Sequence, residues 1–171
     1  QGLNVVMSEV HGMAQRGGTV VTELRMGDVH SPLVEKQGAD MVLAFEPAEL
    51  LRALDKMNHH THVIANQSSI IPFTVSMGIS KYPNKKKLFK KLKDSLEHFY
   101  IIDAETMAKE AGNIISVNIV ILGAALATGI LPIQKNSVIE AIKKNLPEKT
   151  LDVNIKALEV GFQYLTDISV C

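Results

Sequence analysis

A chain of 171 residues is long enough to bury a hydrophobic core without help from disulfides or metal ions. Its hydrophobic fraction of 46% and charged fraction of 21% exclude an intrinsically disordered chain, and its aromatic fraction of 5% predicts an aliphatic core. Eighteen basic residues balance eighteen acidic ones, so the overall charge does not favour nucleic acid or an anionic membrane as the partner.

The single cysteine, Cys171, excludes an internal disulfide, and this chain alone could not ligate an iron–sulfur cluster or a cysteine-bound structural zinc. We therefore expect a cytoplasmic protein, and no secretory leader is visible at its start. The chain begins at Gln1-Gly2 without an initiator methionine, from which we expect a further element ahead of it.

The first part of the chain is predicted to contain three strands and a helix. Residues 3–10 and 19–26 are rich in β-branched residues, and the second segment alternates apolar and polar residues as a half-exposed strand does. Residues 41–45 form a continuous apolar run, which is typical of a strand buried on both faces. Pro47 suits the first turn of the helix that follows, whose leucines form one apolar stripe.

Further strands are predicted in the middle of the chain, at residues 61–66, 73–79 and 99–103. A helix at residues 85–98 lies between the last two strands. It carries most of a lysine-rich segment, while leucines keep helical spacing beneath the lysines.

From residue 103 onward the sequence is predicted to be helical. Asp103 is a suitable N-cap for a helix that Gly112 ends, and later helices are predicted at residues 137–145 and 148–165. The arrangement therefore assigns the second part of the chain to a helical layer.

Residues 114–131 are uncharged and long enough to cross a bilayer. The run contains Asn118 and two glycines, and it lacks flanking aromatic residues or a positive cluster at one end. We therefore favour a buried core helix or a subunit-interface helix over a membrane span.

Strands that alternate with helices predict a three-layer α/β/α fold with a mainly parallel or mixed sheet. We expect one domain over residues 1–171, with a helical C-terminal part at about 103–171. Sheets of this kind place ligands at loops beyond the carboxyl ends of their strands. The connection between the first two predicted strands is interpreted as such a loop.

This connection, SEVHGMAQRGG, holds more functional groups than a plain turn needs. An acid, an imidazole, an amide and a cation precede a glycine pair, which lets backbone N–H groups approach an anionic or planar ligand. A structural role is equally open, with the glycines forming a tight loop that a Glu9–Arg16 pair holds. Because no nucleophile and base are paired in it, we predict a positioning or subunit-contact element and assign no catalytic residue. The candidate site residues are Glu9, His11, Gln15, Arg16, Gly17 and Gly18.

Two other polar clusters admit two interpretations each. The lysine-rich segment is predicted to be the solvated face of a helix, and the alternative is a docking patch for an acidic protein or a phosphate-bearing ligand. The histidine cluster His59, His60 and His62 matches no standard zinc spacing, so no metal site is predicted.

Three asparagines in the helical part have two possible roles, which are internal hydrogen bonding and contact with a partner or cofactor. They are Asn113, Asn118 and Asn154.

The sequence shows no dinucleotide-binding GxGxxG after a strand, no Walker sequence and no serine or zinc hydrolase signature. Several of its segments instead resemble one known family throughout most of the chain. They are SEVHGMAQRGGTVVTELRMGDVHSPLV, ADMVLAFEPAELLRAL, Tyr82-Pro83, EAGNIISVNIVILGAAL and VNIKALEVGF.

These segments are similar to the gamma-type domain of the 2-oxoacid:ferredoxin oxidoreductases, and SEVHGMAQRGG resembles the beta subunit of the indolepyruvate ferredoxin oxidoreductase branch. The resemblance implies one gamma-type domain over residues 1–171. Family members usually begin with a strand and a GxGGQG loop, which this sequence lacks, so no role of that loop is assigned.

The resemblance implies a heteromeric enzyme that oxidatively decarboxylates aryl pyruvates such as indolepyruvate to aryl acetyl-CoA and CO2, with reduction of ferredoxin. Thiamine diphosphate and the iron–sulfur clusters are expected on the alpha subunit, with coenzyme A as co-substrate. The implied partners are that alpha subunit and, through the complex, ferredoxin. The lysine-rich segment is a further candidate, for steering coenzyme A or acidic ferredoxin. We expect the candidate site residues to face the alpha subunit near the thiamine site.

Two hypotheses from other classes remain open at this point. The chain could be an assembly subunit with no residue near the chemistry, using residues 114–131 as an oligomer contact. It could also be a stand-alone small-ligand binding domain.

Overall fold

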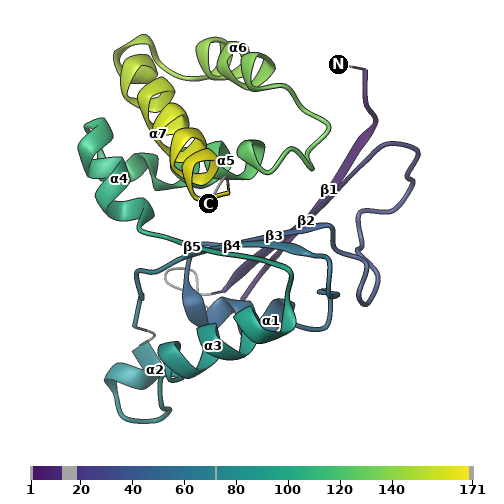
Figure 1. Ribbon diagram of the computed structural model, residues 1–171, viewed down its shortest axis with the longest axis vertical. Helices are drawn as coiled ribbons and strands as arrows, with labels where there is room; N and C mark the ends of the chain where they lie inside the picture. Colours follow the sequence, from purple (N-terminus) through teal and green to yellow (C-terminus); the bar gives the residue numbers. More distant parts are fainter. Residues whose placement is uncertain (1, 13–18, 72, 170–171) are drawn as a thin grey trace.

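The computed structural model describes residues 2–12, 19–71 and 73–169, whose strands form two sheets (Figure 1). The strands are β1 Val5–His11, β2 Val20–Met26, β3 Met41–Ala44, β4 His62–Asn66 and β5 His98–Ile102. The helices are α1 Leu50–Ala53, α2 Phe73–Ser76, α3 Lys85–Ser95, α4 Ala104–Ala111, α5 Val117–Ala127, α6 Lys135–Asn145 and α7 Leu151–Ser169. Short 3-10 helices, η1 Pro47–Glu49, η2 Ile114–Ser116 and η3 Glu148–Thr150, lead into α1, α5 and α7.

The strands β3, β4 and β5 form a parallel sheet with β4 in the centre. Helices α1, α2 and α3 lie on one side of this sheet and α4 to α7 on the other (Figure 1). The central strand is apolar on both faces, because Val63 and Ala65 pack toward α1 and α3 while Ile64 packs toward α4, α5 and α7. The three-layer α/β arrangement with a helical C-terminal part is therefore confirmed.

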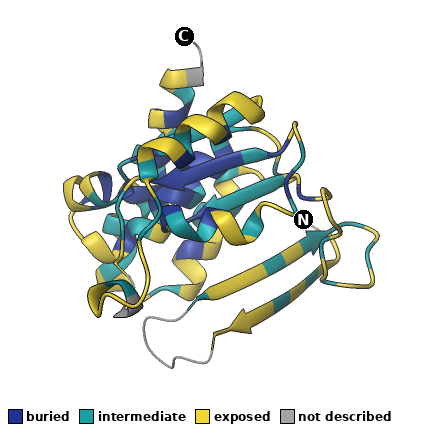
Figure 2. Ribbon diagram, turned by 90° about the horizontal axis from the view of Figure 1, so that it is seen from below, coloured by how far each residue is buried: buried dark blue, intermediate teal, exposed yellow. Residues whose placement is uncertain are grey.

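The strands β1 and β2 pair with each other in an antiparallel hairpin and form a separate sheet. The alternation in β2 correctly predicts a strand, but Leu24 on this strand does not pack against the body of the molecule. Leu24 is 43% exposed and lies opposite Met7, which is 60% exposed, while the polar Glu23 is half-buried on the other face. Figure 2 shows this hairpin as largely exposed beside the buried parallel strands.

One ion pair ties the inner face of the hairpin to the rest of the chain. Glu23 accepts a hydrogen bond of 2.7 Å from the backbone N–H of Val34 and lies 3.2 Å from the ammonium group of Lys56, which also donates to the Val34 carbonyl. The Val34 N–H, more than Lys56, lowers the pKa of the Glu23 carboxyl against the opposing effect of burial. The inner face is therefore anchored by charge and hydrogen bonds rather than by apolar burial.

The helices α5 and α7 meet at two glycines with their backbones in direct contact. A Cβ atom on Gly123 would lie 2.1 Å from the carbonyl oxygen of Leu158, and one on Gly161 would lie 2.0 Å from that of Val120. Neither position can accept a side chain unless a helix moves. This contact brings both helices onto the sheet and buries Ala124, among other small residues, between them.

The predicted strand at residues 73–79 is wrong, because Phe73–Ser76 forms the short helix α2. The backbone N–H of Gly78 bonds to the Val75 carbonyl at 2.9 Å, and Gly78 has a φ of 73°, so the segment closes into a turn. Its short apolar pattern could not distinguish a strand from a turn of helix.

The other predicted elements are confirmed with shifted ends. The lysine-bearing helix ends at Ser95, because Leu96 is extended and begins the approach to β5. The apolar run 114–131 contains η2 and α5, and α5 is a core helix. None of the helices that the structure describes has the length and apolarity needed to cross a membrane.

We predict that Gly161→Ala lowers the free energy of unfolding by at least about 3 kcal/mol, because the new methyl group would overlap the Val120 carbonyl. Gly129→Ala is the matched control, because Gly129 has a φ of 72° but open space around it, and backbone strain alone costs about 1 kcal/mol. Urea denaturation followed by circular dichroism measures both. Equal losses for the two variants would contradict the close helix contact.

We predict that Glu23→Gln lowers the free energy of unfolding by about 1 to 2 kcal/mol at neutral pH, since a charged hydrogen bond to Val34 becomes a neutral one. The pKa of Glu23 is below its ordinary value of 4.5 in the fold, so this stabilisation is complete above that value. It is lost as the pH falls through the lower folded pKa. Urea denaturation over a pH series tests this, with Glu35→Gln as the exposed control, and a pH-independent difference would sink the assignment.

Candidate functional site

The structure describes two of the six candidate site residues, and both lie on β1. The Nε2 atom of His11 is 2.6 Å from the Glu9 carboxylate, which also accepts a hydrogen bond of 3.4 Å from Thr22 on β2. Both side chains are exposed, so this pair contributes little to stability. Its two residues lie on the outward face of the hairpin, and the remaining candidates, Gln15, Arg16, Gly17 and Gly18, lie outside the described residues.

The base of the hairpin connection lies against the residues that follow β3. The N–H of Gly12 donates to the Thr19 carbonyl at 2.7 Å, which closes the hairpin at its last described residues. The Thr19 hydroxyl then donates to the Glu49 carboxylate at 3.3 Å. Because Glu49 belongs to η1, which comes directly after β3, the base of this loop lies at the carboxyl edge of the parallel sheet.

The carboxyl edge of the sheet carries a buried carboxylate, Glu46, at the start of η1. Its side chain accepts hydrogen bonds from the N–H groups of Ala48, at 2.6 Å, and Glu49, at 3.3 Å, and so caps this short helix. The phenol of Tyr82 donates to the other oxygen of the same carboxylate. Burial, and then the hydrogen bond to Glu46, raises the pKa of Tyr82 above its ordinary value of 10.0, so the phenol remains a donor.

A buried amide, Asn66, joins the ends of the three parallel strands. Its Nδ2 atom donates to the Phe45 carbonyl at 3.3 Å, directly after β3, and its Oδ1 atom accepts from the Ala104 N–H at 3.2 Å, after β5. Beside it, Asp103 caps α4 through the Thr106 N–H at 3.1 Å, which is the largest cause of its lowered pKa. The polar groups at this edge are thus engaged as caps and cross-links, which suits a rigid platform and not a nucleophile with its base.

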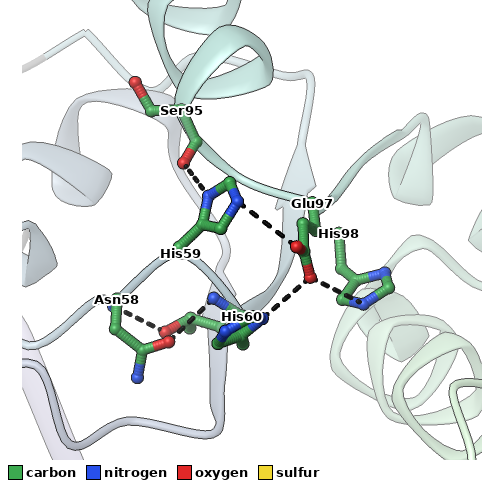
Figure 3. Close-up of polar contacts among 7 residues, drawn as sticks. Asn58, His59, His60, Ser95, Glu97 and His98 are labelled. Atoms are coloured by element: carbon green, nitrogen blue, oxygen red, sulfur yellow. Dashed lines mark hydrogen bonds and ion pairs between the residues drawn. The ribbon is translucent and has the colours of Figure 1, made fainter.

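Two histidines of the cluster, His59 and His60, contact Glu97 at the opposite edge of the sheet, where β4 and β5 begin (Figure 3). Glu97 lies 3.2 Å from His59 and 2.8 Å from His60, and the hydrogen bond from His60 is the largest cause of its lowered pKa. The remaining histidine, His62, stacks on His98 with ring centroids 3.9 Å apart. Within the described residues, no group of three or more His, Cys, Asp or Glu side chains is arranged to hold a metal ion.

The three asparagines of the helical part have different environments. Asn113 caps η2 through the Ile115 N–H at 3.0 Å, and Asn154 joins Ser116 to the Thr150 carbonyl. Internal hydrogen bonding therefore accounts for these two. Asn118 is exposed and lines a groove of about 370 Å³ between the start of α5 and η3, so its role stays open.

Comparison with known proteins assigns this architecture to a family. The family model for pyruvate ferredoxin/flavodoxin oxidoreductase matches residues 1–164. The chain belongs to this oxidoreductase family. It is 45% identical over 160 residues to the indolepyruvate oxidoreductase subunit IorB of Methanothermobacter thermautotrophicus, and this match covers 94% of the chain and 82% of that protein. The subunit of the same name from Archaeoglobus fulgidus is 40% identical, with 94% and 80% covered.

Solved structures of the 2-oxoacid ferredoxin oxidoreductases share the fold. The gamma subunit of a keto/oxoacid ferredoxin oxidoreductase from Geobacter sulfurreducens matches with a TM-score of 0.66 and 20% identity, covering 97% of this chain and 82% of that one. The 2-oxoglutarate:ferredoxin oxidoreductase from Magnetococcus marinus matches with a TM-score of 0.66 and 19% identity, covering 98% of this chain and 26% of that one. The gamma-type fold expected from the sequence is confirmed.

The sequence alone identified the glycine-rich connection of this oxidoreductase domain. It did not identify the residues at the carboxyl edge of the parallel sheet that support the base of this connection. Glu46 and Asn66 each follow an apolar strand run within two residues, which is a detectable signal at the carboxyl edge of a parallel sheet. Tyr82 is far from both in sequence and carried no such signal. Glu97 was missed because the histidines it joins are distant along the chain.

We predict that Tyr82→Phe removes a tyrosine titration with a pKa above 10.0 and lowers the free energy of unfolding by about 1 to 2 kcal/mol, because the buried Glu46 loses a donor. Absorbance at alkaline pH measures the titration, and urea denaturation measures the stability. Tyr164→Phe, at an exposed position on α7, is the control. An unchanged titration curve in Tyr82→Phe would contradict the assignment.

Proposed function

We propose that this chain is the small, cluster-free subunit of an indolepyruvate:ferredoxin oxidoreductase. The assembled enzyme would oxidatively decarboxylate aryl pyruvates such as indolepyruvate to aryl acetyl-CoA and CO2, with coenzyme A as co-substrate and ferredoxin as electron acceptor. The observation that carries this proposal is the 45% identity to a protein named indolepyruvate oxidoreductase subunit IorB, over 94% of the chain. One gamma-type domain over residues 1–171 and a cytoplasmic location are parts of the same proposal.

The chemistry of this chain's side chains supports activity only with a larger alpha subunit. The chain has one cysteine, so it cannot supply the four thiolates of an iron–sulfur cluster. Its described residues offer no group of carboxylates and histidines suited to a metal ion such as the one that accompanies a diphosphate. The single cysteine does not fit an iron–sulfur cluster, and the described residues offer no such group for the metal ion of thiamine diphosphate, so we propose that the alpha subunit holds both.

The part proposed for this chain is to present the connection after β1 to the partner. Glu9 and His11 lie on the outward face of the hairpin, and the contact between Thr19 and Glu49 fixes one end of the connection at the sheet edge. A guanidinium group binds carboxylates and phosphates in a bidentate geometry. We assign to Arg16 a contact with a substrate carboxylate or a cofactor phosphate near the thiamine site, in company with Gln15 and the glycine pair 17–18.

We predict that Arg16→Ala lowers the kcat/KM of the reconstituted enzyme for indolepyruvate by about tenfold or more, because a charge-assisted hydrogen bond contributes about 1.5 to 3 kcal/mol. Size-exclusion chromatography and thermal unfolding should show an assembled complex of unchanged stability. Lys144→Ala, which removes an exposed cation from α6, is the matched control and should leave the kinetics unchanged. Unaltered kinetics in Arg16→Ala would refute the role of this residue.

A co-expression experiment tests the proposed function as a whole. The chain with its alpha subunit should purify as a brown complex that reduces ferredoxin when given indolepyruvate and coenzyme A. Failure of the two chains to associate, or a complex that is inactive on every aryl pyruvate, would overturn the proposal.

A further inference from the structure

An apolar groove of about 550 Å³ lies between α1 and α3. These two helices cover the face of the sheet opposite the C-terminal helices (Figure 1). Its floor is formed by the side chains of Met57, Leu88 and Leu92, all of which are buried. Its α1 rim carries Leu51 and Leu54, which are 45% and 44% exposed. Exposed leucines beside a buried apolar floor form a surface that an apolar side chain of another molecule can cover.

The groove is separate from the candidate site. Apart from Lys91, its polar lining comes from Gln37, Asn58, His59 and Ser95, which all precede a strand of the parallel sheet. It therefore lies at the amino edge of the sheet, whereas the base of the glycine-rich connection lies at the carboxyl edge.

The helix that forms one wall of the groove is strongly basic in a chain without net charge. From Lys85 to Ser95, α3 contains six lysines and a single acidic residue, Asp94. Lys91 lines the groove, and Lys87 lies one turn before it on the same side of the helix. Within the part of the chain that the structure describes, Lys85 donates a hydrogen bond to the Gln67 carbonyl, and the other five lysine side chains form neither an ion pair nor a hydrogen bond. They are Lys86, Lys87, Lys90, Lys91 and Lys93.

Glu97, which contacts the groove-lining His59, does not offset these cations. Glu97 already accepts contacts from His59 and His60, and the Nδ1 atom of His59 lies 3.0 Å from the Ser95 carbonyl. Both ring nitrogens of His59 thus face oxygen acceptors. The groove therefore combines an apolar floor with a basic wall whose charges have no partner in the described chain.

We propose that this groove docks a segment of an acidic protein, which inserts aliphatic side chains between α1 and α3 and places carboxylates against Lys87 and Lys91. Charge complementarity selects the acidic partner, and the leucine-lined floor selects a protein segment over a free phosphate. Lysines act as separate point charges on flexible stems, which suits steering of a carboxylate-rich surface.

The test uses the full chain and a fluorescein-labelled synthetic peptide with leucines at helical spacing and glutamates between them. Fluorescence anisotropy should show saturable binding that weakens with added salt. The double variant Lys87→Glu with Lys91→Glu should weaken binding by about tenfold, and Leu54→Ser should do the same. If the double variant fails to fold, Lys91→Gln replaces it, with a smaller loss expected.

Matched controls change the same chemistry away from the groove. Lys109→Glu with Lys144→Glu reverses two exposed cations on α4 and α6, and Ile168→Ser removes an exposed apolar side chain from α7. These controls should bind the peptide as the unmodified chain does.

Three results would overturn the proposal. One is the absence of saturable peptide binding, and another is an equal loss in the control variants, which would show non-specific attraction. The third is displacement of the peptide by inorganic pyrophosphate together with undiminished binding in Leu54→Ser, which would show a phosphate site. None of these measurements uses enzyme activity, so they leave the proposed oxidoreductase function untouched.

Discussion

The backbone contact between α5 and α7 determines how the helical layer lies on the sheet. Because Gly123 and Gly161 carry no side chain, the two helices approach closely enough for small residues such as Ala124 and Ala157 to fill the space between them. The pair covers Ile64 and the rest of the upper sheet face, and α4 packs against α7. The start of α4, and with it the end of β5, takes its position from this contact.

Asn66 connects the start of α4 to the carboxyl edge of the sheet. Its amide accepts a hydrogen bond from the first residue of α4 and donates one to the carbonyl that follows β3, so it links segments that continue on opposite sides of the sheet. Glu46 and Tyr82 then fix η1, and Glu49 receives Thr19 from the hairpin. The base of the glycine-rich connection therefore rests on a chain of contacts that begins in the helical core.

Hydropathy patterns predicted most of the fold, because apolar segments such as β4 and α5 are stable only when they are buried in the core. The same patterns failed for residues 73–79, where a short apolar run forms a turn of helix, and for Leu24, whose strand exposes its apolar face. The connection after β1 could be identified as a candidate site from its composition. Its supporting residues could not be identified as a group, because Tyr82 meets Glu46 only through the tertiary fold.

The way in which the hairpin is attached has a consequence for its dynamics. It is held by Glu23 and Lys56 and by a hydrogen bond from Asn4 to the Val29 carbonyl, while much of its apolar surface faces water. Segments with few buried apolar contacts open locally at a lower free energy than the core. Amide hydrogens in β2 should thus exchange with solvent far faster than those in β4. The hairpin that carries the glycine-rich connection can therefore change its position without unfolding of the parallel sheet.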